Sequence, residues 1–244
     1  MSLQGASVLV TGGTRGIGRA IALRLVADGA GRAVLGYMRN DTAAEEAAAL
    51  VEQAGAEAVL VRGNVADARV VSELAAGGPY RVVVHNAATG VIRPALETED
   101  KHWDWTLGAN ARALLTLARA CAAQMPDGSS IVGVSSLGSI RVLANYTLVG
   151  VSKAALEALV RYLAVELAPR IRVNAVSAGV VETGALEHFP NREEMISSGL
   201  KRTPAGRLVE PQDVADAVCF LCSPAAAMVC GHTLVVDGGF SLLA

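Results

Sequence analysis

Seven short, valine-rich segments recur along the chain, and a stretch with helical periodicity separates each from the next. The segments are apolar on both faces, as the buried strands of a parallel sheet are. We expect strands at Ser7–Val10, Ala33–Tyr37, Ala58–Arg62, Val82–His85, Ile131–Ser135, Arg172–Val176 and Thr233–Val236. Strands and helices that alternate in this way predict an α/β chain with a doubly wound parallel sheet of seven strands.

Amphipathic patterns between these strands predict the helices. We expect them at Gly16–Ala27, Thr42–Gln53, Asp100–Met125, Tyr146–Leu167 and Pro211–Cys222. A capping box of Thr42 and Glu45 is predicted to open the second helix. Between Val65 and Tyr80 there is room for only a short helix, which Gly77-Gly78-Pro79 ends.

Length and charge narrow the class of protein. The 244 residues fit one domain, residues 1–244, and the formal charge of −2 gives no basic surface for nucleic acid. No apolar run reaches the roughly 18 residues of a membrane span, and the N-terminus is interpreted as a first strand rather than a signal peptide. We therefore expect a cytoplasmic protein.

Cys219 and Cys222 form a C-x-x-C inside a helical pattern, which we interpret as core cysteines rather than metal ligands.

A glycine-rich loop, TGGTRGIG, follows the first predicted strand and opens the first helix. Glycines in this context permit a tight turn and a close approach of the backbone to a pyrophosphate, which the free N–H groups of the helix N-terminus bind. The loop predicts a Rossmann-type dinucleotide site. Its cofactor-binding candidates are Gly12, Thr14, Arg15, Gly16, Ile17 and Gly18.

The end of the second strand indicates which dinucleotide binds. An acidic residue there would hold the 2′-hydroxyl of NAD, but residues 36–40 read GYMRN, with no acid before Asp41. Arg39 and Arg15 can instead flank a 2′-phosphate, because guanidinium groups bind phosphate well. We therefore predict NADPH as the cofactor. Asn64 and Asn86 follow the third and fourth strands, at the sheet edge where such folds bind ligands, and are further cofactor candidates.

A serine, a tyrosine and a lysine form the candidate catalytic group: Ser136, Tyr146 and Lys153. Together with the glycine-rich loop, the HNAA segment at residues 85–88 and Asn110, they give the chain a resemblance to the short-chain dehydrogenase/reductase superfamily from end to end. The superfamily's usual motif is Tyr-x3-Lys. Here Val149 stands four residues before Lys153, and the tyrosine lies seven before it.

The longer Tyr-x6-Lys spacing resembles that of the enoyl-acyl-carrier-protein reductases of the third type. Five further segments resemble the same subfamily: HWDWT, SSLGSIR, NYTLVGVSKAALEALVRYLAVEL, ALEHFPNRE and TPAGRLVE. The resemblance implies an NADPH-dependent oxidoreductase that reduces the double bond of a trans-2-enoyl thioester, carried by acyl carrier protein or CoA, in fatty-acid or related acyl biosynthesis. It also implies a homo-oligomer, a dimer or a tetramer.

The shift of the tyrosine has a chemical rationale. Three residues correspond to about 4.5 Å along a helix axis, and positions four and seven residues before Lys153 lie on nearly the same face. In ketone reduction the acid serves the oxygen on the carbon that accepts hydride. In enoyl thioester reduction hydride goes to C3 and charge appears on an oxygen two carbons further away. A displaced acid therefore suits the second reaction.

These considerations suggest roles for the remaining residues. Tyr146 would donate a hydrogen bond to the thioester oxygen, while Lys153 would hold the nicotinamide ribose. Ser136 either assists the oxyanion or only orients the substrate, and Asn110 is either structural or part of a proton relay or helix kink. Thr183 is a candidate partner of the nicotinamide carboxamide.

The long segment after the sixth strand is predicted to be a substrate-binding lid at about residues 182–204. Leu186, Phe189, Met195, Ile196 and Leu200 give it an apolar side, which would cover an acyl chain or form a subunit contact. Alternative functions are a pathway-specific reductase of another enoyl thioester, a 3-ketoacyl or other carbonyl reductase, and a non-catalytic dinucleotide sensor. The sequence does not distinguish the acyl chain length or the carrier.

Overall fold

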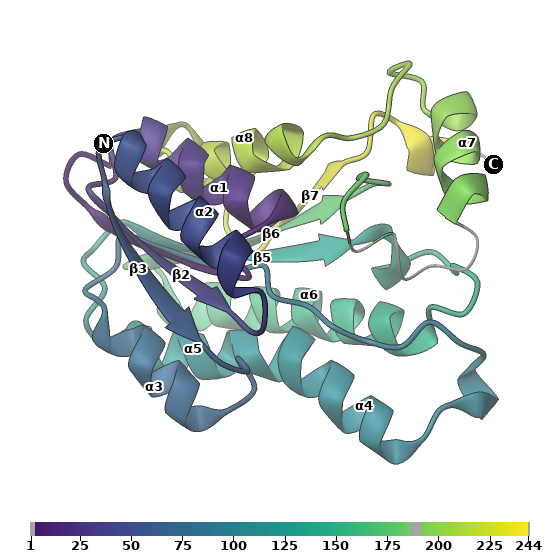
Figure 1. The fold of residues 1–244 in the computed structure, drawn as a ribbon, viewed down its shortest axis with the longest axis horizontal. Coiled ribbons are helices and arrows are strands. Elements are labelled where there is room, and N and C mark those ends of the chain that lie inside the picture. Colours follow the sequence, from purple (N-terminus) through teal and green to yellow (C-terminus); the bar gives the residue numbers. More distant parts are fainter. Residues whose placement is uncertain (1–2, 185, 187–191, 244) are drawn as a thin grey trace.

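The computed structural model describes residues 3–184, 186 and 192–243, and its centre is one parallel sheet (Figure 1). The seven strands lie in the order β3-β2-β1-β4-β5-β6-β7. Their bounds are Ser7–Thr11 (β1), Arg32–Tyr37 (β2), Glu57–Arg62 (β3), Val82–His85 (β4), Ser129–Ser136 (β5), Ile171–Ala178 (β6) and Thr233–Val236 (β7). The predicted α/β class, the doubly wound topology and all seven strands are confirmed, with ends that differ by at most two residues.

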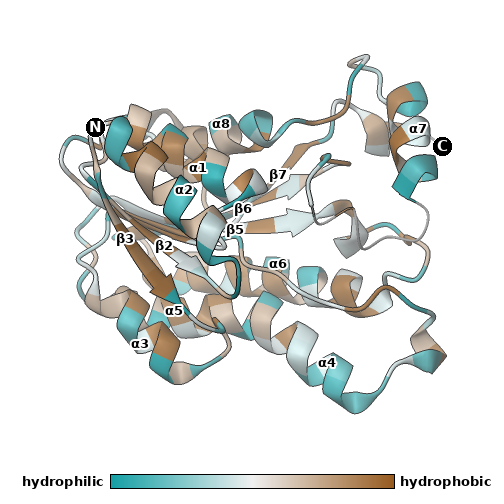
Figure 2. Ribbon diagram, in the orientation of Figure 1, coloured by the Kyte–Doolittle hydropathy of each residue, from teal (hydrophilic) through white to brown (hydrophobic). Residues whose placement is uncertain are grey.

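Helices cover both faces of the sheet. The bounds are Gly16–Ala27 (α1), Asp41–Gln53 (α2), Ala68–Ala76 (α3), Asp100–Leu107 (α4), Ala113–Cys121 (α5), Thr147–Leu167 (α6), Arg192–Arg202 (α7) and Pro211–Cys222 (α8). One buried cluster joins α1, α2 and α8 to the sheet, and a second joins α3, α5 and α6 to its other face. Figure 2 shows the hydrophobic residues concentrated in this layered interior, with hydrophilic residues along α4 and α7.

Three of the predicted helices differ from the structure. The helix expected at Asp100–Met125 is interrupted by a π-turn, Gly108–Arg112, between α4 and α5. A π-turn adds one residue to the helical ladder and redirects its polar groups. The side chain of Asn110 bonds to the backbone of Thr89 and to Ser152, contacts between distant segments that no local pattern reveals.

The capping box predicted at Thr42 and Glu45 is wrong. Helix α2 begins one residue earlier, and the side chain of Asn40 accepts a hydrogen bond of 3.0 Å from the N–H of Ala43. Asn40 directly precedes the first helical residue, so its short side chain reaches the N–H groups of the first turn. Thr42 already lies within the helix and cannot act as the N-cap.

Helix α6 begins just after the tyrosine. Tyr146 is its N-cap with φ −104° and ψ 11°, and Asn145 has a φ of +60°, the one positive φ outside glycine among the described residues. The spacing argument assumed that Tyr146 lies inside the helix. In the structure it lies just before the first helical residue. The predicted lid contains α7 and the buried Leu186, whereas Phe189 lies outside the described residues.

Candidate active site

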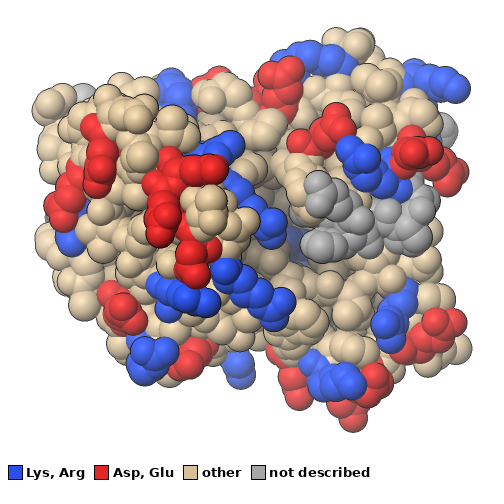
Figure 3. Space-filling view, viewed as in Figure 1, with Lys and Arg blue, Asp and Glu red and all other residues tan. Residues whose placement is uncertain are grey.

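The carboxyl ends of the parallel strands open on one edge of the sheet. β1, β4 and β5 end there at Thr11, His85 and Ser136. Figure 3 shows a hollow on this side of the molecule, with Lys and Arg side chains gathered along its wall. A basic cleft at this edge suits an anionic ligand.

The glycine-rich loop is packed so closely that two of its glycines admit no side chain. Gly12 has a φ of +64°, and a Cβ built on Gly18 would lie 2.0 Å from the carbonyl oxygen of Gly12. The loop then opens into α1, whose N-cap residue Arg15 makes no side-chain cap. The N–H groups of the first turn are therefore not capped by that side chain, as a phosphate site requires.

Asn86 braces this loop from β4. Its side-chain amide donates to the carbonyl oxygens of Thr11 and Gly12, at 3.2 and 3.0 Å. Asn64 uses its side-chain oxygen to accept from the N–H of Ala66 at 3.0 Å, which closes a turn after β3. Both cofactor candidates thus shape the site, and contact of either with a cofactor remains a prediction.

The segment after β6 lies against the glycine-rich loop. A Cβ built on Gly16 would lie 3.3 Å from Cγ2 of Thr183, and one built on Gly184 would lie 3.7 Å from an Arg15 guanidinium nitrogen. Thr14 and Ile17, the other candidates in the loop, are buried and half-buried respectively. The fold thereby brings the candidates of the loop and Thr183 together, although more than 160 residues separate them in the sequence.

A second arginine, which sequence reasoning missed, accompanies Arg39 at the ends of β2 and β3. Sheet register pairs Tyr37 with Arg62, and Arg62 forms a 3.1 Å ion pair with Asp41. Asp41 also accepts a 2.9 Å hydrogen bond from the Tyr37 hydroxyl. The nearest acid is therefore already paired, while the exposed Arg39 follows the end of β2. Only the pairing of β2 with β3 reveals Arg62.

His85 links the glycine-rich loop to the π-turn, a role the sequence did not indicate. The hydroxyl oxygen of Thr11 accepts from the N–H groups of Asn86 and Ala87, at 3.2 and 3.1 Å. Its proton is thus directed to Nδ1 of His85, 3.1 Å away, and Nε2 carries the imidazole proton and donates to the carbonyl oxygen of Asn110 at 3.2 Å. Burial, and then the charge of Lys153, lower the pKa of His85 to about 4.

Tyr146 and Ser136 lie side by side at the end of β5. The Tyr146 hydroxyl is 3.5 Å from Oγ of Ser136, which also accepts from the N–H of Gly138 at 3.3 Å. Burial raises the pKa of the Tyr146 phenol, and the hydrogen bond with Ser136 partly offsets the rise. The phenol therefore keeps its proton at neutral pH, which is the form that can donate a hydrogen bond.

Lys153 is buried one step behind this pair. Its ammonium donates to the carbonyl oxygen of Val134 at 2.7 Å, two residues before Ser136 on the same strand. Burial lowers the pKa of Lys153 to about 8, and the nearby carboxylate of Glu157 opposes the fall. Glu157 itself accepts a 2.5 Å hydrogen bond from Ser135. Ser136, Tyr146 and Lys153 are thus gathered around the end of β5.

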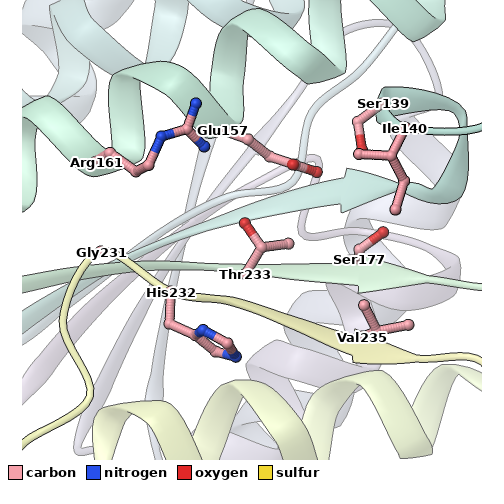
Figure 4. A pocket seen from close by; sticks show the side chains of 9 residues that line it. All are labelled: Ser139, Ile140, Glu157, Arg161, Ser177, Gly231, His232, Thr233 and Val235. Carbon is pink, nitrogen blue, oxygen red and sulfur yellow. The ribbon is translucent and has the colours of Figure 1, made fainter.

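A separate cavity of about 320 Å³ lies on the α6 side of the sheet, near β7 (Figure 4). It is lined by Ser139, Ile140, Glu157, Arg161, Ser177, Gly231, His232, Thr233 and Val235. None of the catalytic candidates lines it, so we do not assign it to the reaction.

Within the described residues no group of three or more His, Cys, Asp or Glu side chains is arranged to hold a metal ion. No helix in that part of the chain combines the length and apolar character needed to cross a membrane.

Comparisons with known proteins place the chain in a family. A family model described as enoyl-(acyl carrier protein) reductase matches residues 12–241. The 1-cyclohexenylcarbonyl-CoA reductase of Streptomyces collinus is 38% identical over 97% of this chain and 87% of its own length. The L-xylulose reductase of Mesocricetus auratus is 37% identical over 98% of both chains.

A solved structure shares the fold almost completely. The short-chain dehydrogenase from Burkholderia cenocepacia J2315, crystallised with NADP, has a TM-score of 0.90 and 32% identity over 99% of this chain and all of its own. Family model, relatives and fold agree along nearly the whole length. The chain therefore belongs to the short-chain dehydrogenase/reductase superfamily of oxidoreductases.

Proposed function

We propose that this protein uses NADPH to reduce the carbon–carbon double bond of a 2-enoyl thioester. One observation carries the proposal: the phenol beside Ser136 belongs to Tyr146, whereas the residue four before Lys153 is the buried Val149. Val149 has no ionisable group, so the acid that faces the substrate must come from the displaced tyrosine.

The choice of NADPH rests on charge. No free acid follows β2, because Asp41 is paired with Arg62 and Tyr37. Arg39 is exposed there, and Arg15 lies at the N-terminus of α1. These guanidinium groups suit a 2′-phosphate, and the Burkholderia cenocepacia relative was crystallised with NADP.

The residues divide the chemistry as follows. NADPH supplies the hydride when it is bound. Tyr146, protonated because burial raises its pKa, donates a hydrogen bond to the thioester oxygen and stabilises the negative charge that develops there. The enolate left by hydride addition at C3 then takes a proton at C2 from water, which completes the saturated thioester. Ser136 orients the phenol of Tyr146 and donates a second hydrogen bond to the negatively charged thioester oxygen. Lys153 carries a buried positive charge toward the nicotinamide ribose, and the glycine-rich loop and Thr183 hold the pyrophosphate and carboxamide.

CoA is supported as the carrier by the Streptomyces collinus relative, which is named as a CoA thioester reductase, and acyl carrier protein by the name of the family model. Reduction of a carbonyl is the second candidate, since the L-xylulose reductase is 37% identical. Helix α7 with Leu186 is proposed as the lid over the acyl chain. A homo-oligomer and a cytoplasmic location stay predictions.

The test is NADPH consumption by the purified protein with crotonyl-CoA, and in parallel with acetoacetyl-CoA and L-xylulose. We expect oxidation of NADPH with the enoyl thioester alone. Tyr146→Phe should lower kcat by about 10²- to 10⁴-fold, because it removes the donor but keeps the ring. Turnover of only the carbonyl substrates would refute the proposed reaction, and wild-type rates in Tyr146→Phe would refute the assignment of the acid.

A further inference from the structure

The ring of Tyr146 lies directly against the backbone of Gly138. A Cβ built on Gly138 would lie 2.5 Å from Cε1 and 2.6 Å from Cδ1 of that ring. Non-bonded carbon atoms approach no closer than about 3.5 Å without repulsion. Any side chain at position 138 would therefore push the ring away by about 1 Å.

A second glycine allows this approach. A Cβ built on Gly150, in the first turn of α6, would lie 2.7 Å from the carbonyl oxygen of Gly138 and 3.8 Å from Cδ1 of Tyr146. Without a side chain at Gly150, the short turn Leu137–Ser139 packs closely on α6. We call the space made by Gly138 and Gly150 the tyrosine slot.

Backbone conformation does not account for these glycines. Twelve glycines in the described chain have positive φ, and neither Gly138 nor Gly150 is among them. An L-residue would fit both backbone positions, so the requirement for glycine arises from space. The space is the volume that the ring of Tyr146 and the turn itself occupy.

Gly138 also fixes the serine. Its N–H donates to Oγ of Ser136 at 3.3 Å, and the hydroxyl of Tyr146 lies 3.5 Å from the same oxygen. Gly138 therefore sets both the position of the Tyr146 ring and the orientation of the Ser136 hydroxyl.

We propose that Gly138 is a positioning residue that, through the tyrosine slot, fixes the Tyr146 hydroxyl against Ser136 for the reaction. The inference deepens the proposed function and rests on it where Tyr146 is taken as the acid. Since a misplacement of about 1 Å in a catalytic group can cost about 10²-fold in rate, we expect a loss of that size from Gly138→Ala.

The kinetic test is a double-mutant cycle on crotonyl-CoA. Gly138→Ala should lower kcat about 100-fold while the Kd for NADPH stays within about threefold. In the Tyr146→Phe background, the same substitution should cost little more, because no hydroxyl is left to misplace. Ser139→Ala, in the same turn, adds no atoms and serves as the matched control with near wild-type rates. Losses that multiply in the double variant would overturn the inference.

A spectroscopic test is independent of turnover. The chain has four tyrosines, so protein labelled with 3-fluorotyrosine gives few ¹⁹F resonances, and Tyr146→Phe identifies that of Tyr146. Gly138→Ala should shift this resonance, and Ser139→Ala should not. An unmoved resonance would overturn the slot whatever the substrate proves to be. A wild-type protein that reduces no enoyl thioester would instead refute the proposed function alone.

The test survives a failure of Gly138→Ala to fold. Gly138→Ala combined with Tyr146→Ala removes the ring that the new methyl group would meet. If the clash is with the ring, the double variant recovers NADPH binding. A double variant that stays unfolded would place the clash elsewhere and overturn the inference.

Discussion

Protonation of His85 should destabilise the folded protein in mild acid. The neutral ring accepts at Nδ1 from Thr11 and donates from Nε2 to Asn110. A second proton would set Nδ1–H against a hydroxyl whose lone pairs are already engaged by the N–H groups of Asn86 and Ala87. The imidazolium would also be buried near the charge of Lys153.

The magnitude follows from the pKa of His85, lowered from 6.5 to about 4. Between these values the unfolded chain binds a proton that the folded chain does not, so stability falls as the pH drops from 6.5 to 4. A difference of 2.5 pKa units corresponds to about 3 kcal/mol at 1.36 kcal/mol per unit. The loss is absent above pH 6.5 and complete below about pH 4.

Urea unfolding of the wild type and of His85→Gln at several pH values between 7 and 4 measures the effect. Glutamine does not titrate, and the other acids and histidines are common to both proteins, so their contributions cancel in the difference. We expect the wild type to lose about 3 kcal/mol relative to the variant over this range. Parallel pH dependences would refute both the neutral ring and the hydrogen-bond chain assigned to it.

Three other substitutions test the site. Arg39→Ala should weaken NADPH binding by about 10- to 100-fold and leave NADH unchanged, as titration of cofactor fluorescence would show; equal losses for both would contradict the phosphate contact. Gly18→Ala would place a Cβ 2.0 Å from the Gly12 carbonyl oxygen. Thermal unfolding should therefore show a stability loss of about 3 kcal/mol or more, and cofactor titration should show no NADPH binding. Burial lowers the pKa of Lys153 to about 8, so the cofactor-free wild type should gain stability from pH 8 to pH 10.5 relative to Lys153→Met. A constant difference between the two free energies of unfolding over this pH range would contradict the prediction.

Much of the site is local in sequence. The glycine-rich loop follows a strand and opens a helix, so Gly12 and Gly18 are recognised from the motif and its flanks alone. The spacing of Tyr146 from Lys153 is likewise read directly from the chain. What the motif does not show is the role of Asn86, because the side chain holds a loop that precedes it by more than 70 residues.

The wrong expectations share one cause. The π-turn at Asn110 and the N-cap of α2 at Asn40 depend on which side chain reaches a backbone group in space. Periodicity predicts that a segment is helical, but it carries no information on contacts with Thr89 or Ser152. Arg62 was missed for the same reason, since it lies beside Tyr37 only in the assembled sheet.

The sequence by itself determined the strands, the layered parallel sheet and the membership of a dinucleotide-binding superfamily, because these depend on hydrophobic periodicity and on motifs of adjacent residues. The tertiary structure alone decided where the phenol of Tyr146 lies. Tyr146 is the N-cap that precedes α6, and its ring occupies space that Gly138 and Gly150 leave open. Close packing is a property of the assembled interior, so the volume that places a catalytic candidate appears only once distant segments are brought into contact.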